Sequence, residues 1–300
     1  MESLKTILYF SIFNYPIKME EIYDFSKSKD IAKIKEELSE LILRKIIFKV
    51  DDFYLSTYDL EAIEKRKKGN QMAIKALIKA KERAAFIAKF PYVQAVGVSG
   101  SLSKGYYDND SDIDFFVITT PRKLWITRTF LMLYKKIFLL NSRKYFCINY
   151  FMSQNSLEIE EKNRFTATEI KTLIPFQGKT ILTEFYKKNE WVSDTFWNMN
   201  PILDGIPEVK KNIFVHCIEN VLKTRFGDWL DDTFKKITIK KWKSKFDFMS
   251  DEDFKVALKS TKNISKHHPS NFQRKVIMAL NEKYDQVHKN HSIVLSKEHV

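Results

Sequence analysis

The stretch from residue 96 to residue 119, VGVSGSLSKGYYDNDSDIDFFVIT, constrains the fold more than any other part of the chain. Two β-rich apolar runs, Val93 to Val98 and Phe115 to Ile118, enter and leave it, and this pattern predicts two strands. Residues that favour a close backbone turn lie between the two runs: Gly100, Ser101 and Gly105. The stretch therefore predicts a strand, a glycine turn and a second strand.

Two acidic residues, Asp112 and Asp114, lie two positions apart in this stretch. Both are expected on the second strand, whose alternation points the two carboxylates to the same face. Neighbouring carboxylates repel each other unless a positive charge lies between them. Magnesium prefers oxygen ligands and usually completes its shell with substrate phosphates. The spacing therefore predicts a Mg²⁺ (or Mn²⁺) site with Asp112 and Asp114 as metal ligands.

The turn before these acids has the composition of an anion site. Backbone N–H groups in a Gly/Ser turn form a concavity for anions, the hydroxyls of Ser101 and Ser103 add donors, and Lys104 adds charge. Together with the metal site, the turn predicts binding of a metal–nucleoside triphosphate. The alternative is a solvated acidic loop made by four residues: Asp108, Asp110, Asp112 and Asp114. The agreement of the acids with the glycines, serines and flanking strands favours the binding site.

These residues resemble the signature of the DNA polymerase β-like nucleotidyltransferase superfamily. The resemblance rests on Gly100-Ser101, Gly105 and the run Ser111-Asp112-Ile113-Asp114 with apolar residues after it, and it covers residues 92–153. It implies that the glycine–serine pair holds a triphosphate, that the acids bind magnesium, and that a nucleoside monophosphate is transferred to an acceptor with release of pyrophosphate. The residues expected to contact the nucleotide are Gly100, Ser101, Ser103, Lys104 and Gly105.

The third strand expected in this superfamily departs from its usual pattern. It spans Tyr145 to Met152, where members usually carry a third acid, but the sequence KYFCINYFMS has none. Alternation places Cys147, Asn149 and Phe151 on one face, so Asn149 is the candidate catalytic residue beside Asp112 and Asp114.

An asparagine at this position bears on the acceptor, because Asn149 cannot take a proton from an attacking hydroxyl. An active enzyme is then expected to use an anionic acceptor, unless Glu158 or Glu160 replaces the missing acid. A catalytically inactive nucleotide sensor or scaffold is the alternative.

Residues 1–58 have the element order of a winged helix: three helices, Leu4 to Ile12, Met19 to Ser26 and Ile31 to Arg44, precede a hairpin at residues 46–56. Residues 1–60 hold nine basic and eleven acidic side chains, a net charge of minus two. DNA affinity depends mainly on neutralising phosphates, so DNA binding is disfavoured and packing or partner recognition is favoured. A DNA-binding regulator stays an alternative. So small a domain is expected to bury apolar side chains against the helix that follows.

The other regions complete an α/β (α+β) organisation, with a nucleotidyltransferase core and small mixed sheet at residues 91–156. A connecting long helix is expected at residues 59–90, and residues 157–300 are expected to be mostly helical, with one helix capped by Thr166 or Thr168 and Glu169 in its first turn. The aromatic cluster at Trp191, Phe196 and Trp197 favours a core over a base-stacking platform.

Residues 210–300 are basic, with nineteen Lys and Arg against eleven Asp and Glu. Six lysines with Trp242 among them predict either RNA contact or a solvated helix face: Lys235, Lys236, Lys240, Lys241, Lys243 and Lys245. In the polar run that begins at Lys266, His267 and His268, zinc is disfavoured because no further ligand has suitable spacing. A phosphate or acceptor contact from His268 or Arg274 is favoured instead.

The chain has two cysteines, Cys147 and Cys217, whose spacing matches neither a metal site nor a disulfide framework. This usage favours a reducing, cytoplasmic location. No membrane span is expected, because Lys135 and Lys136 interrupt the best apolar run, from Trp125 to Leu140.

Overall fold

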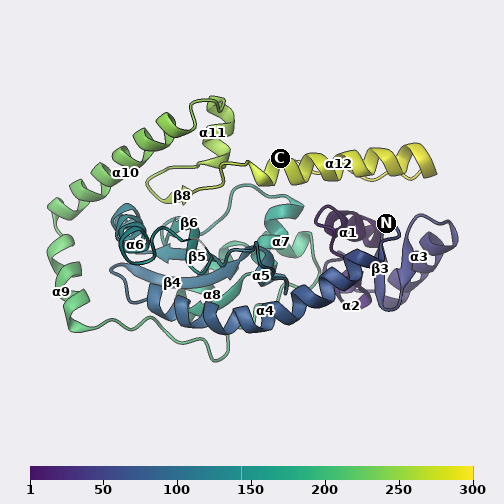
Figure 1. Ribbon diagram of the computed structural model, residues 1–300, viewed down its shortest axis with the longest axis horizontal. Coiled ribbons are helices and arrows are strands. Elements are labelled where there is room, and N and C mark those ends of the chain that lie inside the picture. Colours follow the sequence, from purple (N-terminus) through teal and green to yellow (C-terminus); the bar gives the residue numbers. More distant parts are fainter. Residues whose placement is uncertain (143, 300) are drawn as a thin grey trace.

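A five-stranded mixed sheet lies at the centre of the computed structural model, which describes residues 1–142 and 144–299 (Figure 1). The strands are, in chain order, β4 (Val93–Ser99), β5 (Asp114–Thr119), β6 (Cys147–Ser153), β7 (Ile174–Gln177) and β8 (Ile264–Lys266). Their order in the sheet is β7-β4-β5-β6-β8, with only β5 and β6 parallel. The short helix α5 (Gly100–Ser103) follows β4 at the predicted turn. The α/β (α+β) class with a small mixed sheet is confirmed.

Two strands of the sheet, β7 and β8, come from beyond residue 156, in the region expected to be mostly helical. They are four and three residues long. Such short edge strands carry almost no alternation of their own, and they form by pairing with β4 and β6. The sheet therefore extends past the expected end of the core.

Helices cover both faces of the sheet. The helices α4 (Leu60–Ile87) and α6 (Leu124–Phe138) pack on one face, and α7 (Arg164–Thr172) and α8 (Lys179–Lys188) pack on the other. The long helix α4 begins where the Asp59 side chain accepts a hydrogen bond from the Ala62 N–H. Its face toward the sheet is a stripe of buried alanines, which lets the helix lie close to the strands: Ala73, Ala76, Ala80 and Ala84.

The N-terminal region contains the expected helices and hairpin. Its elements are α1 (Glu2–Ser11), β1 (Ile17–Lys18), α2 (Met19–Asp24), α3 (Ile31–Leu43), β2 (Phe48–Val50) and β3 (Phe53–Leu55). The strands form an antiparallel sheet in the order β1-β3-β2. Whether this region is a winged helix in function stays a prediction.

The apolar core of the N-terminal region is completed by the C-terminal helix α12 (Phe272–His291), which runs beside α1 in Figure 1. Buried side chains of α12 and the segment after it belong to the same core cluster: Val276, Leu280, Tyr284, Val287, Ile293 and Leu295. The expected packing on α4 also occurs, through Ile63 against Phe53 and Leu55. Two ends of the chain that are far apart in sequence thus share one core.

The remaining elements follow α8 and precede β8 in the sequence, and α10 among them packs against α6. They are η1 (Glu190–Asp194), α9 (Ile213–Leu222), α10 (Arg225–Lys245) and α11 (Asp251–Ala257). Phe196 is buried in the core beneath the sheet, as the sequence indicated for this aromatic cluster. Within the described residues, no helix is both long enough and apolar enough to cross a membrane.

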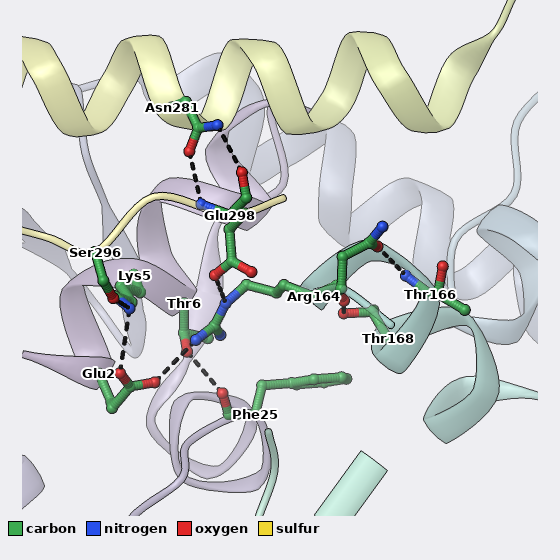
Figure 2. A network of polar contacts seen from close by, with 11 residues as sticks. Glu2, Lys5, Thr6, Phe25, Arg164, Thr166, Thr168, Asn281, Ser296 and Glu298 are labelled. Atoms are coloured by element: carbon green, nitrogen blue, oxygen red, sulfur yellow. Dashed lines mark hydrogen bonds and ion pairs between the residues drawn. The ribbon is translucent and has the colours of Figure 1, made fainter. Parts of the chain in front are cut away.

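Arg164, the first residue of α7, joins both ends of the chain to the core (Figure 2). One Nη atom lies 2.8 Å from a Glu2 carboxylate oxygen, and Nε lies 3.1 Å from a Glu298 carboxylate oxygen. Asn281 of α12 in turn exchanges two hydrogen bonds with the backbone of Glu298. Since α7 also carries Glu169, this network positions a helix that reaches the predicted site.

Candidate active site

The turn after β4 requires glycine at its first residue. Gly100 has φ of +73°, and a Cβ atom there would lie 2.6 Å from Oδ2 of Asp114. Only glycine tolerates both conditions. The sequence therefore brings the backbone of the turn directly against the acid at the start of β5.

Asp114 is held by the next strand. Nδ2 of Asn149 donates to Oδ1 of Asp114 over 2.8 Å, and the Cys147 thiol lies 3.3 Å from the Asn149 side-chain oxygen. Burial raises the pKa of Asp114 to about 6, and the negative charges of Asp112 and Glu169 act in the same direction. A Cys147 hydrogen bond and the charge of Lys104 oppose this rise. Asp114 thus lies half-buried in a region of negative potential that a cation would stabilise.

The alternation predicted for the third strand is wrong beyond Asn149. Phe115 pairs with Ile148 and Phe116 with Tyr150, so β6 has one extra residue at this point. After this irregularity Phe151 packs with Ile148 in the core under α4 and α6, and not on the face of Cys147 and Asn149. A bulge of this kind shifts the following side chains to the opposite face.

Asp112 precedes β5 instead of belonging to it, because the strand begins at Asp114. It is partly exposed, and its charge reaches both Asp114 and Cys147. The strand alternation that predicted both carboxylates on one face therefore does not apply to Asp112. The two carboxylates are nevertheless close enough for the charge of Asp112 to raise the pKa of Asp114.

A cavity of about 390 Å³ opens beside the turn. The predicted residues in its lining are Gly100, Ser101, Asp114 and Asn149. Apolar side chains that include Phe116, Leu173 and Phe185 line another part. Two hydrogen bonds stabilise the turn from outside the cavity. The Ser103 hydroxyl donates to the Gly100 carbonyl, and the Asn70 side chain of α4 donates to the Gly105 carbonyl.

Glu169 also lines the cavity, and sequence reasoning gave it no role in the site. One of its oxygens accepts from Lys104 Nζ over 2.6 Å, and the other accepts from the Gly100 N–H over 3.3 Å. Lys104 is therefore paired with an acid, while its Nζ also donates to the Gly100 carbonyl. Glu169 lies within α7, whose cap is Asn163 and not the predicted Thr166 or Thr168.

The two acids proposed to replace a third carboxylate lie elsewhere. Glu158 forms an ion pair with Lys162, and Glu160 forms one with Lys259. Both are exposed, and neither lines the cavity.

A family model described as a nucleotidyltransferase domain matches residues 77–245, more than half of the chain. This chain belongs to the nucleotidyltransferase domain family. The match extends from the second half of α4 to the end of α10 and includes the glycine turn, Asp112 and Asp114. The comparisons found no significant match among curated proteins or solved structures.

The site of this nucleotidyltransferase domain has a donor set that fits magnesium. Asp112 and Asp114 offer carboxylate oxygens, the ligand type that Mg²⁺ prefers. Across residues 1–142 and 144–299 no three or more His, Cys, Asp or Glu side chains gather as a metal-binding group. Magnesium commonly takes only one or two protein carboxylates and completes its shell with phosphates and water. Two carboxylates beside the glycine turn therefore fit a magnesium ion that takes its other ligands from phosphate and water.

Proposed function

We propose that this chain is a magnesium-dependent nucleotidyltransferase that moves a nucleoside monophosphate from a nucleoside triphosphate to an acceptor and releases pyrophosphate. The observation that carries the proposal is the contact between the family-matched glycine turn and Asp114 at the wall of one cavity. Asn149 supports it by orienting the Asp114 carboxylate through a hydrogen bond.

In this proposal Asp112 and Asp114 hold Mg²⁺ (or Mn²⁺), which when bound offsets the negative charge of the phosphates. The turn binds the β- and γ-phosphates through its backbone N–H groups, that of Gly105 included, and through the side chains of Ser101 and Lys104. The Ser103 hydroxyl, which donates to the Gly100 carbonyl, holds the turn in this conformation. Lys104 then exchanges Glu169 for a phosphate oxygen. An acceptor oxygen forms a bond to the α-phosphorus in line, and the bond to the β-phosphate oxygen breaks.

An anionic acceptor suits this site, because the Asn149 side chain cannot take a proton from an attacking hydroxyl. RNA is one candidate through the lysines of α10, of which five are exposed: Lys236, Lys240, Lys241, Lys243 and Lys245. Trp242 contributes no stacking surface, because it is buried against Phe246 and Leu258. DNA is not favoured, since the N-terminal region has a net negative charge. The unpaired thiols of Cys147 and Cys217 support a cytoplasmic location.

Catalytically inactive nucleotide sensing is the second candidate function. Two observations favour it: Asn149 stands where the superfamily usually has an acid, and Glu169 occupies the Gly100 N–H and Lys104. A sensor would bind metal–triphosphate without releasing pyrophosphate.

The test is to incubate the protein with each of the four triphosphates, magnesium or manganese and a cell extract, and to measure pyrophosphate. We expect turnover with at least one triphosphate. Asp112→Asn and Asp114→Asn should weaken metal–triphosphate binding by about tenfold or more and abolish turnover, because each removes a charged ligand. Asp110→Asn, at an exposed position of the same loop, is the matched control and should behave as wild type.

The outcomes separate the candidates. Binding of metal–triphosphate without pyrophosphate release would support the sensor. Wild-type binding and turnover by both the Asp112 and the Asp114 variant would contradict the assignment of the metal ligands.

A further inference from the structure

A buried lysine from outside the family-matched region lines the same cavity. Lys266, the last residue of β8, is 8% exposed, and its Nζ donates to Oε1 of Gln273 over 2.9 Å. Among the described residues no carboxylate forms an ion pair with it. Glu161, the acid that acts on Lys266 from a longer distance, is itself paired with Lys259 at 3.0 Å. Burial lowers the pKa of Lys266, and its side-chain partner among the described residues is the neutral Gln273. Lys266 is therefore a buried basic group whose positive charge a bound anion would stabilise.

The side-chain amide of Gln273 has a nitrogen without a hydrogen-bond partner among the described residues. Gln273 lies in the first turn of α12, is 5% exposed, and its Nε2 forms no hydrogen bond within the described part of the chain. Both Gln273 and Lys266 line the cavity. An uncompensated buried charge and an orphaned buried donor are each costly, and one anionic group bound between them would satisfy both.

The pairing of β6 with β8 places this pair close to the proposed reaction site. Lys266 lies across from Tyr150, the residue after Asn149, and the N–H of His267 donates to the Asn149 carbonyl over 2.9 Å. His268 lines the same cavity, and burial lowers its pKa to about 4, so its imidazole is neutral at pH 7. Positive charge in this part of the lining therefore comes from Lys266.

We propose that Lys266 and Gln273 bind an anionic group, a phosphate or carboxylate, carried by the acceptor. This inference rests on the proposed function and names the class of its second substrate. In the proposed function Lys104 binds the triphosphate at the glycine turn, within the matched residues 77–245, whereas β8 and α12 lie outside them. The added elements thus supply a cation that the family-matched region does not contain at this position.

The experiment titrates the full-length protein with inorganic phosphate and with acetate by calorimetry, without nucleotide. We expect saturable binding of at least one of these anions. Lys266→Met keeps the volume but removes the charge and should weaken binding by about tenfold or more, and Gln273→Leu should weaken it by about threefold. The matched control is Lys289→Met, at an exposed position of α12, which should leave binding unchanged. Circular dichroism checks that each variant is folded.

A second arm identifies which substrate carries the anion. The titration is repeated in the presence of magnesium with non-hydrolysable analogues of the triphosphates. Simultaneous binding of the small anion and the analogue supports an acceptor site, whereas competition would assign Lys266 to the triphosphate and overturn the proposal. Absence of saturable anion binding, or equal binding by wild type and Lys266→Met, would overturn it as well.

Failure of this inference is distinguishable from failure of the proposed function. Lys266→Met should still bind the metal–triphosphate analogue, and Asp114→Asn should still bind phosphate at Lys266. If the wild-type protein does not bind the metal–triphosphate analogue, that result contradicts the proposed function alone, since the anion titration needs no nucleotide.

Discussion

Two buried cations beside α12 have opposite surroundings. Arg164 is 4% exposed and contacts the carboxylates of Glu2 and Glu298. Lys266 is 8% exposed, and within residues 1–142 and 144–299 its Nζ pairs with the neutral amide of Gln273 and with no carboxylate. Both side chains are largely removed from water, so the difference lies in the groups that compensate their charge. A buried cation with two carboxylates belongs to the fold, because removing it strands its partners. A buried cation without one, in the wall of a cavity, is placed for a ligand.

The largest expected effect concerns the fold side of this comparison. Arg164→Met should lower the free energy of unfolding by about 3–5 kcal/mol, because Glu2 and Glu298 lose their common partner in a largely buried place. Chemical denaturation measures this change. Arg44→Met is the matched control, since Arg44 is exposed and its ion pair with Glu40 should contribute no more than about 1 kcal/mol. Equal losses in the two variants would remove the structural role of Arg164.

A smaller effect concerns pH and the neighbour of Lys266. Burial lowers the pKa of His268 to about 4, with Lys266 acting in the same direction. The unfolded chain therefore takes up the proton first as the pH falls below about 6.5, and stability decreases with falling pH.

Replacing His268 by Gln should reduce the loss of unfolding free energy between pH 7 and pH 5 by about 1–2 kcal/mol. Denaturation curves at the two pH values measure this, with His288→Gln at an exposed position of α12 as the control. An unchanged pH dependence in His268→Gln would show that this imidazole is not kept neutral by its surroundings.

Lys104 is an intermediate case, because its carboxylate partner, Glu169, lies within the candidate site itself. Glu169→Gln removes the negative charge that now pairs with Lys104 and faces the Gly100 N–H. We expect the affinity for a metal–triphosphate analogue to rise about three- to tenfold, because phosphate no longer competes with a carboxylate. Titration of the analogue measures the change, and Glu184→Gln at an exposed position of α8 is the control. Weaker binding by Glu169→Gln would instead indicate that this carboxylate helps to hold the metal.

The smallest expected effect is on stability at Lys266. Lys266→Met should leave the free energy of unfolding within about 1 kcal/mol of wild type, because the variant loses an uncompensated buried charge and one hydrogen bond together. If thermal and chemical denaturation show a loss as large as that of Arg164→Met, Lys266 is a structural cation and the contrast between the two disappears.

The sequence by itself predicted the elements whose signals are local. The runs at β4 and β5 and the glycines between them predict a strand, a turn and a strand within 27 residues of chain, from Val93 to Thr119. The alanine-rich helix α4 follows from composition and from the absence of proline. Asp112 and Asp114 were predicted as metal ligands because the glycine turn and the acids belong to one continuous motif, which lies within the family match.

Only the tertiary structure placed Glu169, Lys266 and Gln273 at the site. Glu169 arrives on a helix 55 residues after Asp114, and the other two arrive with a three-residue strand and the first turn of α12. The register shift at Asn149 likewise depends on the partner strand. Pairing between distant strands and packing of α12 on α1 decide these positions. Such contacts leave no periodic pattern in the sequence, because the free energy that selects them comes from burying surfaces that meet only in the folded chain.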